Sequence, residues 1–554
     1  MTIESTDPRL TFGHFLADVA ARHSGRTALV FEDRTISYDG LARDSRQLAR
    51  ALVGAGVVKG ARVAVHMGNR PEWAVAAFSV GAIGGVLVPV NTFASRDELS
   101  YILRHSDASV LLMQPGLLKN RYLEDLLDAH PEIASGEPGR LRCDSLPQLR
   151  RVACFGLDEP RGGVEPWADL LAHGNGVSDS LLDALADQVE PSDDGIIIYT
   201  SGTTAHPKGV LHTQRAPVLQ GWRFADIMRL GAEDRVYTTY PFFWTAGIAM
   251  SLLPTLASGA RLLLQETFEA GAALEMIERE RATAVHAWPH QHKALGEHPS
   301  AASRELGSVR KVDFSTPIAK LAGVELDEYG TQAAYGLSET FTIASMLPAD
   351  APAVLRRATS GRPMPGTVLR IVDPESGKRL SAGSEGEIAV KGVTFMRGYY
   401  KVLPEHYLDD EGFFRTQDGG CLDTDGYLHW SGRLGNLIKT GGANVSPVEI
   451  ETVLANHPDV KIGIPVGIGH PTLGEVVVLC AVPVDDAVLD EAELRAWLRE
   501  RLAAYKVPKR VLLFRVADLS YTGNQKVQTA PLKEEALRRL EAEGAEIDGH
   551  QYGT

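Results

Sequence analysis

Cysteine is scarce in this chain of 554 residues: there are four, and no two of them form a Cys-x-x-Cys pair. They are Cys143, Cys154, Cys421 and Cys480. Zinc sites and disulfide frameworks need cysteines at short, regular spacings. The sequence therefore predicts neither of them, and we expect four reduced thiols in a cytoplasmic enzyme.

Positive charge is also in deficit, because the formal net charge is -15 at pH 7. A chain of that charge repels nucleic acid and anionic lipid unless it carries a local basic patch, and none is evident. The N-terminus lacks the basic segment and apolar core of a secretory signal. We expect a cytoplasmic location and no nucleic-acid partner.

One long stretch, residues 73–95, has no charged side chain and by length alone could cross a membrane. Gly84, Gly85 and Pro89 interrupt it, however, and the segment after the glycines is typical of a short buried strand. The pattern favours a buried helix followed by a parallel strand. We expect no stable membrane insertion.

What the chain does have is enough apolar sequence, 44% of residues, for more than one core. Helix-like segments alternate with short apolar runs, which indicates layered α/β structure with largely parallel sheets. Near residue 360 the pattern changes to strands joined by glycine turns, and the end of the chain is typical of an α+β domain. We predict a large N-terminal domain of α/β subdomains plus a β subdomain, residues 1–433. A small α+β domain follows at residues 434–554, and the glycines near Gly435 fit either a hinge that makes this domain mobile or a plain turn.

The strongest local signal is the loop between Tyr199 and Val210, which follows an apolar run. Small hydroxyl residues, a glycine and one lysine can together present N–H groups, hydroxyls and a cation to phosphate oxygens. Its spacing is not that of a Walker A loop. Taken alone, a loop of this composition is more often a solvated Ser/Thr turn. The candidate phosphate-binding residues are Thr200, Ser201, Gly202, Thr203, Thr204 and Lys208.

In full, this loop resembles the phosphate-binding signature of the adenylate-forming superfamily, which contains acyl-CoA synthetases, luciferases and the adenylation domains of peptide synthetases. Further matching segments follow in the family's order, and the resemblance covers roughly residues 10–535. They are Tyr335–Thr340, Gly361–Gly366, residues 386–400, Thr416–Asp418, Gly426–Tyr427, Gly432–Arg433, Gly441–Gly442, Pro447–Glu451 and Lys526.

The resemblance implies an acyl-CoA ligase that uses ATP, Mg²⁺ and coenzyme A and passes through an acyl-AMP intermediate. The acid's carboxylate attacks the α-phosphate while diphosphate leaves, so metal and cationic donors must absorb negative charge. By resemblance, Glu339 is the magnesium ligand and Ser338 and Thr340 offer hydroxyls to phosphate. The residues expected to act in catalysis are Lys208, Glu339, Thr340 and Lys526.

The resemblance also assigns the nucleotide contacts. Tyr335, with Gly336 after it, is expected to lie against adenine, and Asp418 to accept hydrogen bonds from the ribose hydroxyls. Arg433 is expected to support ribose and phosphate.

The resemblance also implies that the C-terminal domain takes two arrangements, one for each half-reaction. Lys526 is expected to bridge carboxylate and phosphate in the first and to move away in the second. Gly441 and Gly442 are then expected to line the tunnel for the thiol arm of coenzyme A.

The acid itself is only partly readable. Family members that activate amino acids have an aspartate after the position of Phe243, and this chain has Trp244 and, further on, Gly247. An uncharged site suits an acid without an α-amino group, because a buried ammonium without a partner is costly. Trp244 and Gly247 are the predicted pocket residues, and Trp244, Trp288, His290 and His292 are candidates for the wall. Free coenzyme A is the favoured acceptor over a separate carrier protein, and a homodimer is compatible with the sequence.

Several positions depart from the family pattern: Ala205, Gln417 and Gln525 replace glycines, and Trp244 replaces a histidine. The connection between Asp313 and Tyr335 is also short. Three hypotheses therefore stay open. The first is the ordinary two-step ligase. The second is an enzyme that only converts acyl-AMP, made by a partner adenylating enzyme, into the thioester. The third is a catalytically silent nucleotide-binding homologue.

Overall fold

The chain forms two compact units in a computed structural model that describes residues 4–200, 207–436, 438–440, 443–485, 487–502, 506–521 and 527–553. Unit 1 is Met1–Leu369 with Val390–Phe414, and unit 2 is Arg370–Ala389 with Arg415–Thr554. The predicted boundary at residue 433 lies inside unit 2. A division into compact units does not show where the chain rotates, so the hinge near Gly435 stays a prediction.

An eight-stranded sheet dominates the N-terminal part of unit 1. Strand β9 pairs antiparallel with both β8 and β18, and the other paired strands run parallel. In order across the sheet, the strands are β18 (Gly398–Tyr399), β9 (Lys208–Thr213), β8 (Asp194–Thr200), β4 (Val86–Pro89), β3 (Arg62–His66), β5 (Ala108–Met113), β6 (Arg151–Cys154) and β7 (Val164–Pro166).

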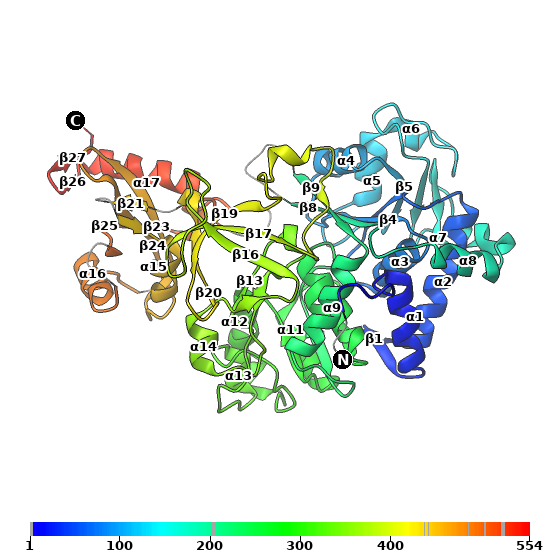
Figure 1. Cartoon of the computed structure of the whole chain (residues 1–554), viewed down its shortest axis with the longest axis horizontal. Coiled ribbons are helices and arrows are strands. Elements are labelled where there is room, and N and C mark those ends of the chain that lie inside the picture. The colour runs from blue at the N-terminus through cyan, green and yellow to red at the C-terminus, as the bar shows by residue number, and fades with distance from the viewer. Residues whose placement is uncertain are drawn as a thin grey trace. The chain divides into compact units, whose positions relative to one another are not determined.

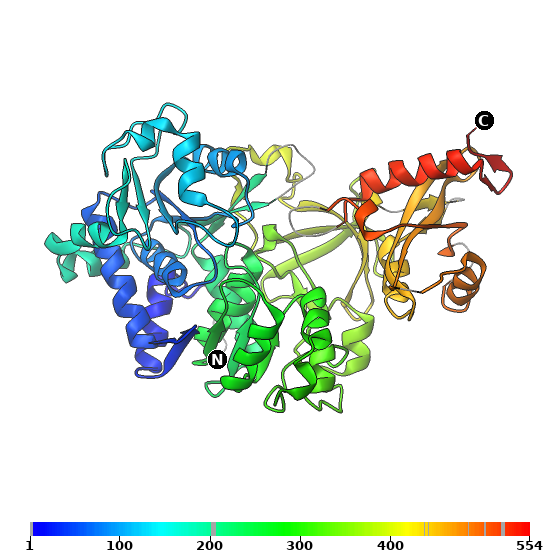
Figure 2. The ribbon, with the colours of Figure 1, turned by 180° about the vertical axis from the view of Figure 1, so that it is seen from behind.

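Helices cover both faces of this sheet, as Figures 1 and 2 show. Successive residues of β3 enter different cores: Val63 and Val65 join one, and Ala64 joins the other. Strands buried on both faces are the reason for continuous apolar runs in the sequence. The helices on one face are α1 (Phe12–Arg22), α2 (Tyr38–Gly54) and α3 (Pro71–Ala82); those on the other are α4 (Arg96–His105) and α5 (Tyr122–Ala129).

The uncharged stretch at residues 73–95 is buried structure, as predicted. It forms most of α3 and then β4, which pairs parallel with β3. Gly84 has a φ of 70°, a conformation that favours glycine, at the turn between them. Among the described helices, none is long and apolar enough to cross a bilayer. All four cysteines are free, as expected.

A second, five-stranded sheet lies in the same unit and carries residues of the candidate site. Its strands are β12 (Ala284–His286), β10 (Arg235–Thr238), β11 (Arg261–Leu264), β1 (Thr27–Phe31) and β2 (Arg34–Ser37). Helices α9 (Arg215–Ile227), α10 (Leu253–Ala257), α11 (Ala270–Arg279) and α12 (Pro289–Glu297) belong to the same region, and Val236, Leu262 and Leu264 join the core of the first sheet.

Unit 2 contains the predicted α+β region and most of the predicted β region, whose strands extend into residues of unit 1. The β region is a sheet in the order β16 (Thr367–Val372), β17 (Gly386–Gly392), β19 (Phe414–Leu422) and β20 (Leu428–Arg433). The α+β region has strands β21 (Ile438–Thr440), β22 (Ala443–Val445), β23 (Val460–His470), β24 (Gly474–Pro483) and β25 (Arg510–Leu513), with helices α15 (Pro447–Leu454), α16 (Glu491–Arg499) and α17 (Thr529–Glu543).

The short connection between Asp313 and Tyr335 contains one five-residue helix, α13 (Pro317–Leu321), and then a loop held by Arg356. The Arg356 side chain is only 1% exposed and its Nη2 lies 2.6 Å from Asp327 Oδ1. Its Nε and Nη1 donate to the Ala351 carbonyl at 2.8 Å and to Gln332 at 3.3 Å. A buried guanidinium with several acceptors fixes the loop that leads into the Tyr335 segment.

We expect Arg356→Met to lower the free energy of unfolding of unit 1 by about 3–5 kcal/mol, because it leaves buried acceptors without a donor. Arg357 pairs with the same Asp327 but is 63% exposed, so Arg357→Met should cost about 0–1 kcal/mol. Urea unfolding of both variants measures the difference. Equal losses would contradict the buried-anchor account.

Candidate active site

The predicted phosphate loop is flanked by two described strand ends. Thr200 ends β8, Lys208 begins β9, and the two residues are paired across the antiparallel ladder. The remaining predicted residues of this loop, and those of the coenzyme A tunnel and the catalytic lysine, lie outside the described residues: Ser201, Gly202, Thr203, Thr204, Gly441, Gly442 and Lys526. Their roles stay predictions.

The Tyr335 segment folds into a tight turn. Tyr335 ends β13 (Ala334–Tyr335), which pairs with β14 (Ser345–Met346), and its side chain is buried. A side-chain carbon at Gly336 would lie 1.6 Å from the Thr342 carbonyl oxygen, so only glycine fits there. A 3-10 turn, Ser338–Thr340, follows and ends with Phe341 and Thr342 at φ values of 50° and 82°. A β-branched residue at such a φ is strained, and such strain persists only where the surrounding structure determines the conformation.

Glu339 is held by a residue 60 positions further along the chain. The Tyr399 hydroxyl donates to Glu339 Oε1 at 2.6 Å. Tyr399 lies on β18, opposite Val210 of β9. The ammonium of Lys208, at the start of β9, lies 5.1 Å from the centre of the Tyr399 ring. The structure therefore brings two predicted catalytic residues to one tyrosine side chain: Lys208 lies near its ring, and Glu339 accepts from its hydroxyl.

A buried histidine, His212, contacts the backbone of the same turn. His212 Nε2 lies 2.8 Å from the Ser338 carbonyl oxygen. Burial lowers the pKa of His212 to about 4, so its ring is neutral at pH 7 and Nε2 is the protonated nitrogen that donates. The Thr340 hydroxyl bonds to the backbone of Leu337, donating to the carbonyl at 3.1 Å. Thr340 thus closes the turn here, and its predicted contact with phosphate stays a prediction.

Glu339 suits a magnesium ion in one respect. Mg²⁺ is commonly held by one or two carboxylates together with substrate phosphates and water. The carboxylate of Glu339 is a hard oxygen ligand whose orientation is set by Tyr399. No group of three or more His, Cys, Asp or Glu side chains that could hold a metal occurs among the described residues.

Trp244 and Gly247, the predicted pocket residues, lie at the start of an irregular helix. Residues Gly247–Leu252 form a π-helix, a form often found at functional sites. A side-chain carbon at Gly247 would lie 2.1 Å from the Pro241 carbonyl oxygen, so glycine allows the helix to approach this loop. Trp244 is partly buried, with its ring centre 5.0 Å from that of Phe243.

Asp418 and Arg433 face each other in unit 2. They are paired in the register of β19 and β20, and Arg433 Nε lies 3.1 Å from Asp418 Oδ1. Arg433 Nη1 also donates to the Thr416 carbonyl at 2.9 Å. The structure therefore brings together the two residues expected to hold ribose, with the Asp418 side chain almost fully buried.

Gln417, beside Asp418, has a φ of 61°. Its side chain is exposed, and its N–H donates to Glu387 Oε1 at 2.8 Å. The left-handed conformation explains why the family motif has glycine here. The replacement in this chain retains the backbone shape and adds strain.

Two supporting residues were missed from the sequence, Tyr399 and His212. Tyr399 lies in a segment already matched to the family, but its partner is far away in the chain. His212 follows the predicted loop as one of a run of ordinary strand residues. The pairing of β18 with β9 places Tyr399, and the contact of His212 with the Ser338 carbonyl appears only in the folded structure.

Two family models match the chain: that of AMP-binding enzymes over residues 16–400, and that of the AMP-binding enzyme C-terminal domain over residues 449–526. A feruloyl-CoA synthase of Amycolatopsis sp is 33% identical over 94% of this chain and 96% of that protein. An indoleacetate–CoA ligase of Aromatoleum aromaticum is 32% identical over 94% and 97%. The fold is similar to that of an anthranilate CoA ligase solved with anthranoyl-AMP, with a TM-score of 0.79 at 23% identity over 96% of this chain and 99% of that one.

Replacing Gln417 by glycine removes the left-handed strain. We expect Gln417→Gly to raise the free energy of unfolding by up to about 1 kcal/mol. A non-glycine residue in the left-handed conformation costs about 1–2 kcal/mol. Glycine removes that cost, but part of the gain is offset because glycine loses more backbone entropy on folding. Gln417→Ala is the matched control, because it removes the side chain and keeps the strain. Thermal unfolding compares the two, and an equal effect of both changes would be inconsistent with strain at this position.

Proposed function

The chain belongs to the AMP-binding enzyme family and is an ATP-dependent acid–CoA ligase, and from this premise we propose how its residues carry the reaction. A carboxylic acid without an α-amino group reacts with ATP to give acyl-AMP and diphosphate. The thiol of coenzyme A then displaces AMP and forms the thioester. The relatives' names include acids with aromatic rings, which favours an acid of that kind here.

The observation that carries this proposal is the hydrogen bond from Tyr399 to Glu339. Donation by this hydroxyl fixes where the carboxylate points. Glu339 would hold Mg²⁺, which when bound would neutralise charge on the phosphates. Lys208, beside the Tyr399 ring, supplies a further cation, while Ser338, Thr340 and the loop from Thr200 to Thr204 donate to phosphate oxygens.

The remaining roles rest on position in the family motifs. Tyr335 and the adjacent Gly336 receive adenine. Asp418, oriented by Arg433, accepts the ribose hydroxyls. Lys526 bridges the carboxylate and the α-phosphate.

The second half-reaction draws on the end of the chain. Gly441 and Gly442 line the thiol tunnel after residues 434–554 rotate about a hinge near Gly435. We place the enzyme in the cytoplasm, with coenzyme A rather than a carrier protein as acceptor. No partner protein and no homodimer contact is required for this path.

A second candidate is an enzyme that performs only thioesterification, with acyl-AMP supplied by a partner. The strained Gln417 beside Asp418 favours it, because the substitution alters the ribose-binding segment while Asp418 and Arg433 remain. Parallel assays from ATP and from synthetic acyl-AMP separate the two candidates. Similar rates support the two-step ligase, and a rate from ATP that is lower by orders of magnitude supports the second candidate.

Tyr399→Phe should slow acyl-AMP formation about 10-fold or more and raise the Mg²⁺ concentration needed for half-maximal rate, because a hydrogen bond to a charged group contributes about 1.5–3 kcal/mol. Tyr400→Phe is the matched control: its hydroxyl donates to a different carboxylate, Asp107, at 2.8 Å. Diphosphate exchange at varied Mg²⁺ measures both. An unchanged Mg²⁺ dependence in Tyr399→Phe would refute the positioning role.

Lys526→Ala should slow acyl-AMP formation by about 100-fold or more, the scale for removing one preorganised charge donor. Conversion of supplied acyl-AMP to thioester should be largely retained. Lys533→Ala is the control, since Lys533 is exposed and pairs with Glu475. Loss of both half-reactions to the same extent would show that Lys526 does not act in the first step alone.

A further inference from the structure

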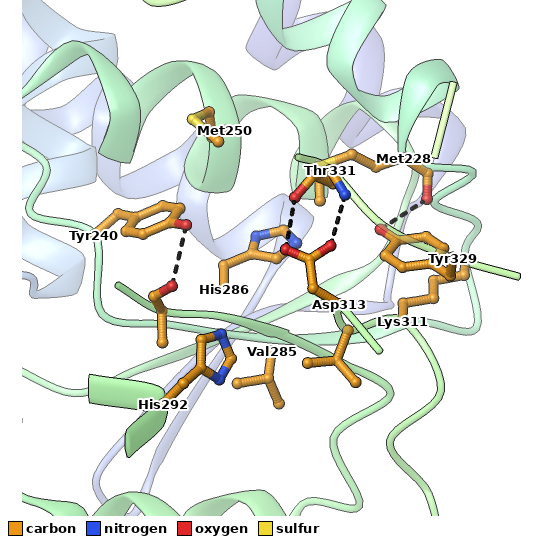
Figure 3. Close-up of a pocket in the computed structure, with 12 residues that line it drawn as sticks. Met228, Tyr240, Met250, Val285, His286, His292, Lys311, Asp313, Tyr329 and Thr331 are labelled. Atoms are coloured by element: carbon orange, nitrogen blue, oxygen red, sulfur yellow. Dashed lines mark hydrogen bonds between the residues drawn. The ribbon is translucent and has the colours of Figure 1, made fainter. Parts of the chain in front are cut away.

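A small cavity of about 30 Å³ lies inside unit 1, next to the predicted acid pocket. Figure 3 shows Tyr240, His286 and Asp313 converging on it from three separate segments. Met228, Met250 and Val285 supply apolar wall. By size, the cavity accommodates about one or two water molecules or one small polar group.

Two buried histidines line this cavity without using their full hydrogen-bonding capacity. His286, at the end of β12, is 6% exposed, and His292, on α12, is 7% exposed. Neither ring nitrogen of His286, and not Nδ1 of His292, has a hydrogen-bond partner among the described residues. The Met250 backbone favours the protonated form of His286 slightly, but no hydrogen bond of ordinary geometry joins them. Unpaired buried polar atoms of this kind cost about 1–3 kcal/mol each, which a bound polar group would recover.

Both histidines are neutral, because burial lowers the pKa of each to about 4. A neutral imidazole has one N–H donor and one nitrogen acceptor, so the pair can donate to an oxygen and also accept from a hydroxyl. An anionic group is disfavoured. The cation in the lining, Lys311, lies 2.5 Å from Asp234 and is already paired.

A cationic group is disfavoured as well. Asp313 already accepts from Thr331, from the backbone N–H at 2.6 Å and from the hydroxyl at 3.4 Å. Burial also raises the pKa of Asp313, which weakens it as a partner for an ammonium. A neutral oxygen meets the unpaired donors and acceptors without requiring a counter-charge.

The cavity adjoins the residues that frame the acid. Met250 lies on the π-helix that begins at Gly247, and the Tyr240 ring centre is 4.5 Å from that of Trp288. Thr331 precedes Tyr335 by four residues in the segment that enters β13. The cavity thus lies beside the helix that begins at Gly247, one of the two predicted pocket residues.

Resting on the ligase function proposed above, we infer that this cavity receives a neutral oxygen, hydroxyl or ketone, at the far end of the acyl group, hydrogen-bonded by His286 and His292. The enzyme is then selective for acids that end in such an oxygen over apolar isosteres and over acids with a second charge. Sites built to hydrogen-bond a substrate hydroxyl discriminate strongly against analogues that lack it.

The test is thioester formation with phenylpropanoates that differ only at the para position. Wild-type enzyme should use the hydroxy acid at least about 10-fold better, by kcat/KM, than the methyl isostere, or the acetyl acid better than the isopropyl isostere. Para-carboxy and para-trimethylammonio acids should be poor substrates. A preference in the hydroxy–methyl pair indicates that the cavity binds a hydroxyl, and a preference in the acetyl–isopropyl pair indicates a ketone.

Variants locate the preference. His286→Phe and His292→Phe should each reduce the ratio of kcat/KM values, oxygen-bearing acid over apolar isostere, toward 1. His286→Gln retains a donor and an acceptor and should therefore keep part of that ratio. His406→Phe is the control, because His406 is exposed. Equal kcat/KM values of the wild type for oxygen-bearing and apolar acids, or a higher value for a charged acid, would overturn this inference and leave the proposed function standing. Absence of thioester from every acid tested would instead count against the proposed function.

Discussion

The hydrogen bond from Tyr399 to Glu339 is the contact on which the candidate site depends. It joins three segments that are distant in sequence: the start of β9 with Lys208, the turn with Glu339, and β18 with Tyr399. Tyr399 contacts both charged side chains: its hydroxyl donates to the carboxylate of Glu339, and its ring lies beside the ammonium of Lys208. The antiparallel pairing of β18 with β9 is what places that side chain. The edge of the eight-stranded sheet therefore builds part of the candidate site as well as the scaffold.

The turn that carries Glu339 has backbone conformations and close contacts that few residue types accept. Gly336 allows contact with the Thr342 carbonyl that any side chain would prevent, and Thr342 adopts a strained, left-handed φ. His212 and Thr340 hold the same turn by hydrogen bonds to backbone. Strain of this kind persists only where the surroundings determine the conformation. The buried Arg356 does the same for the loop before Tyr335.

Much of the architecture was predictable because it follows from local pattern. The uncharged stretch at residues 73–95 formed α3 and β4, as the glycines and the proline indicated. Asp418 and Arg433 were assigned to ribose separately, and their pairing depends on the register of β19 and β20, which periodicity does not determine. His292 was one candidate among four for the acid wall. Its unpaired nitrogen and its proximity to His286 become visible only after α12 packs beside β12.

The central claim is that this chain itself joins the acid's carboxylate to the α-phosphate of ATP at the Glu339 site. The most direct measurement uses the best acid of the substrate panel with its carboxylate labelled by oxygen-18, incubated with ATP, Mg²⁺ and coenzyme A and analysed by mass spectrometry. The account predicts one labelled oxygen in the AMP produced, because the attacking carboxylate oxygen remains on phosphorus when the thiol displaces AMP. Thioester formed with label in orthophosphate, or with none in AMP, would contradict it.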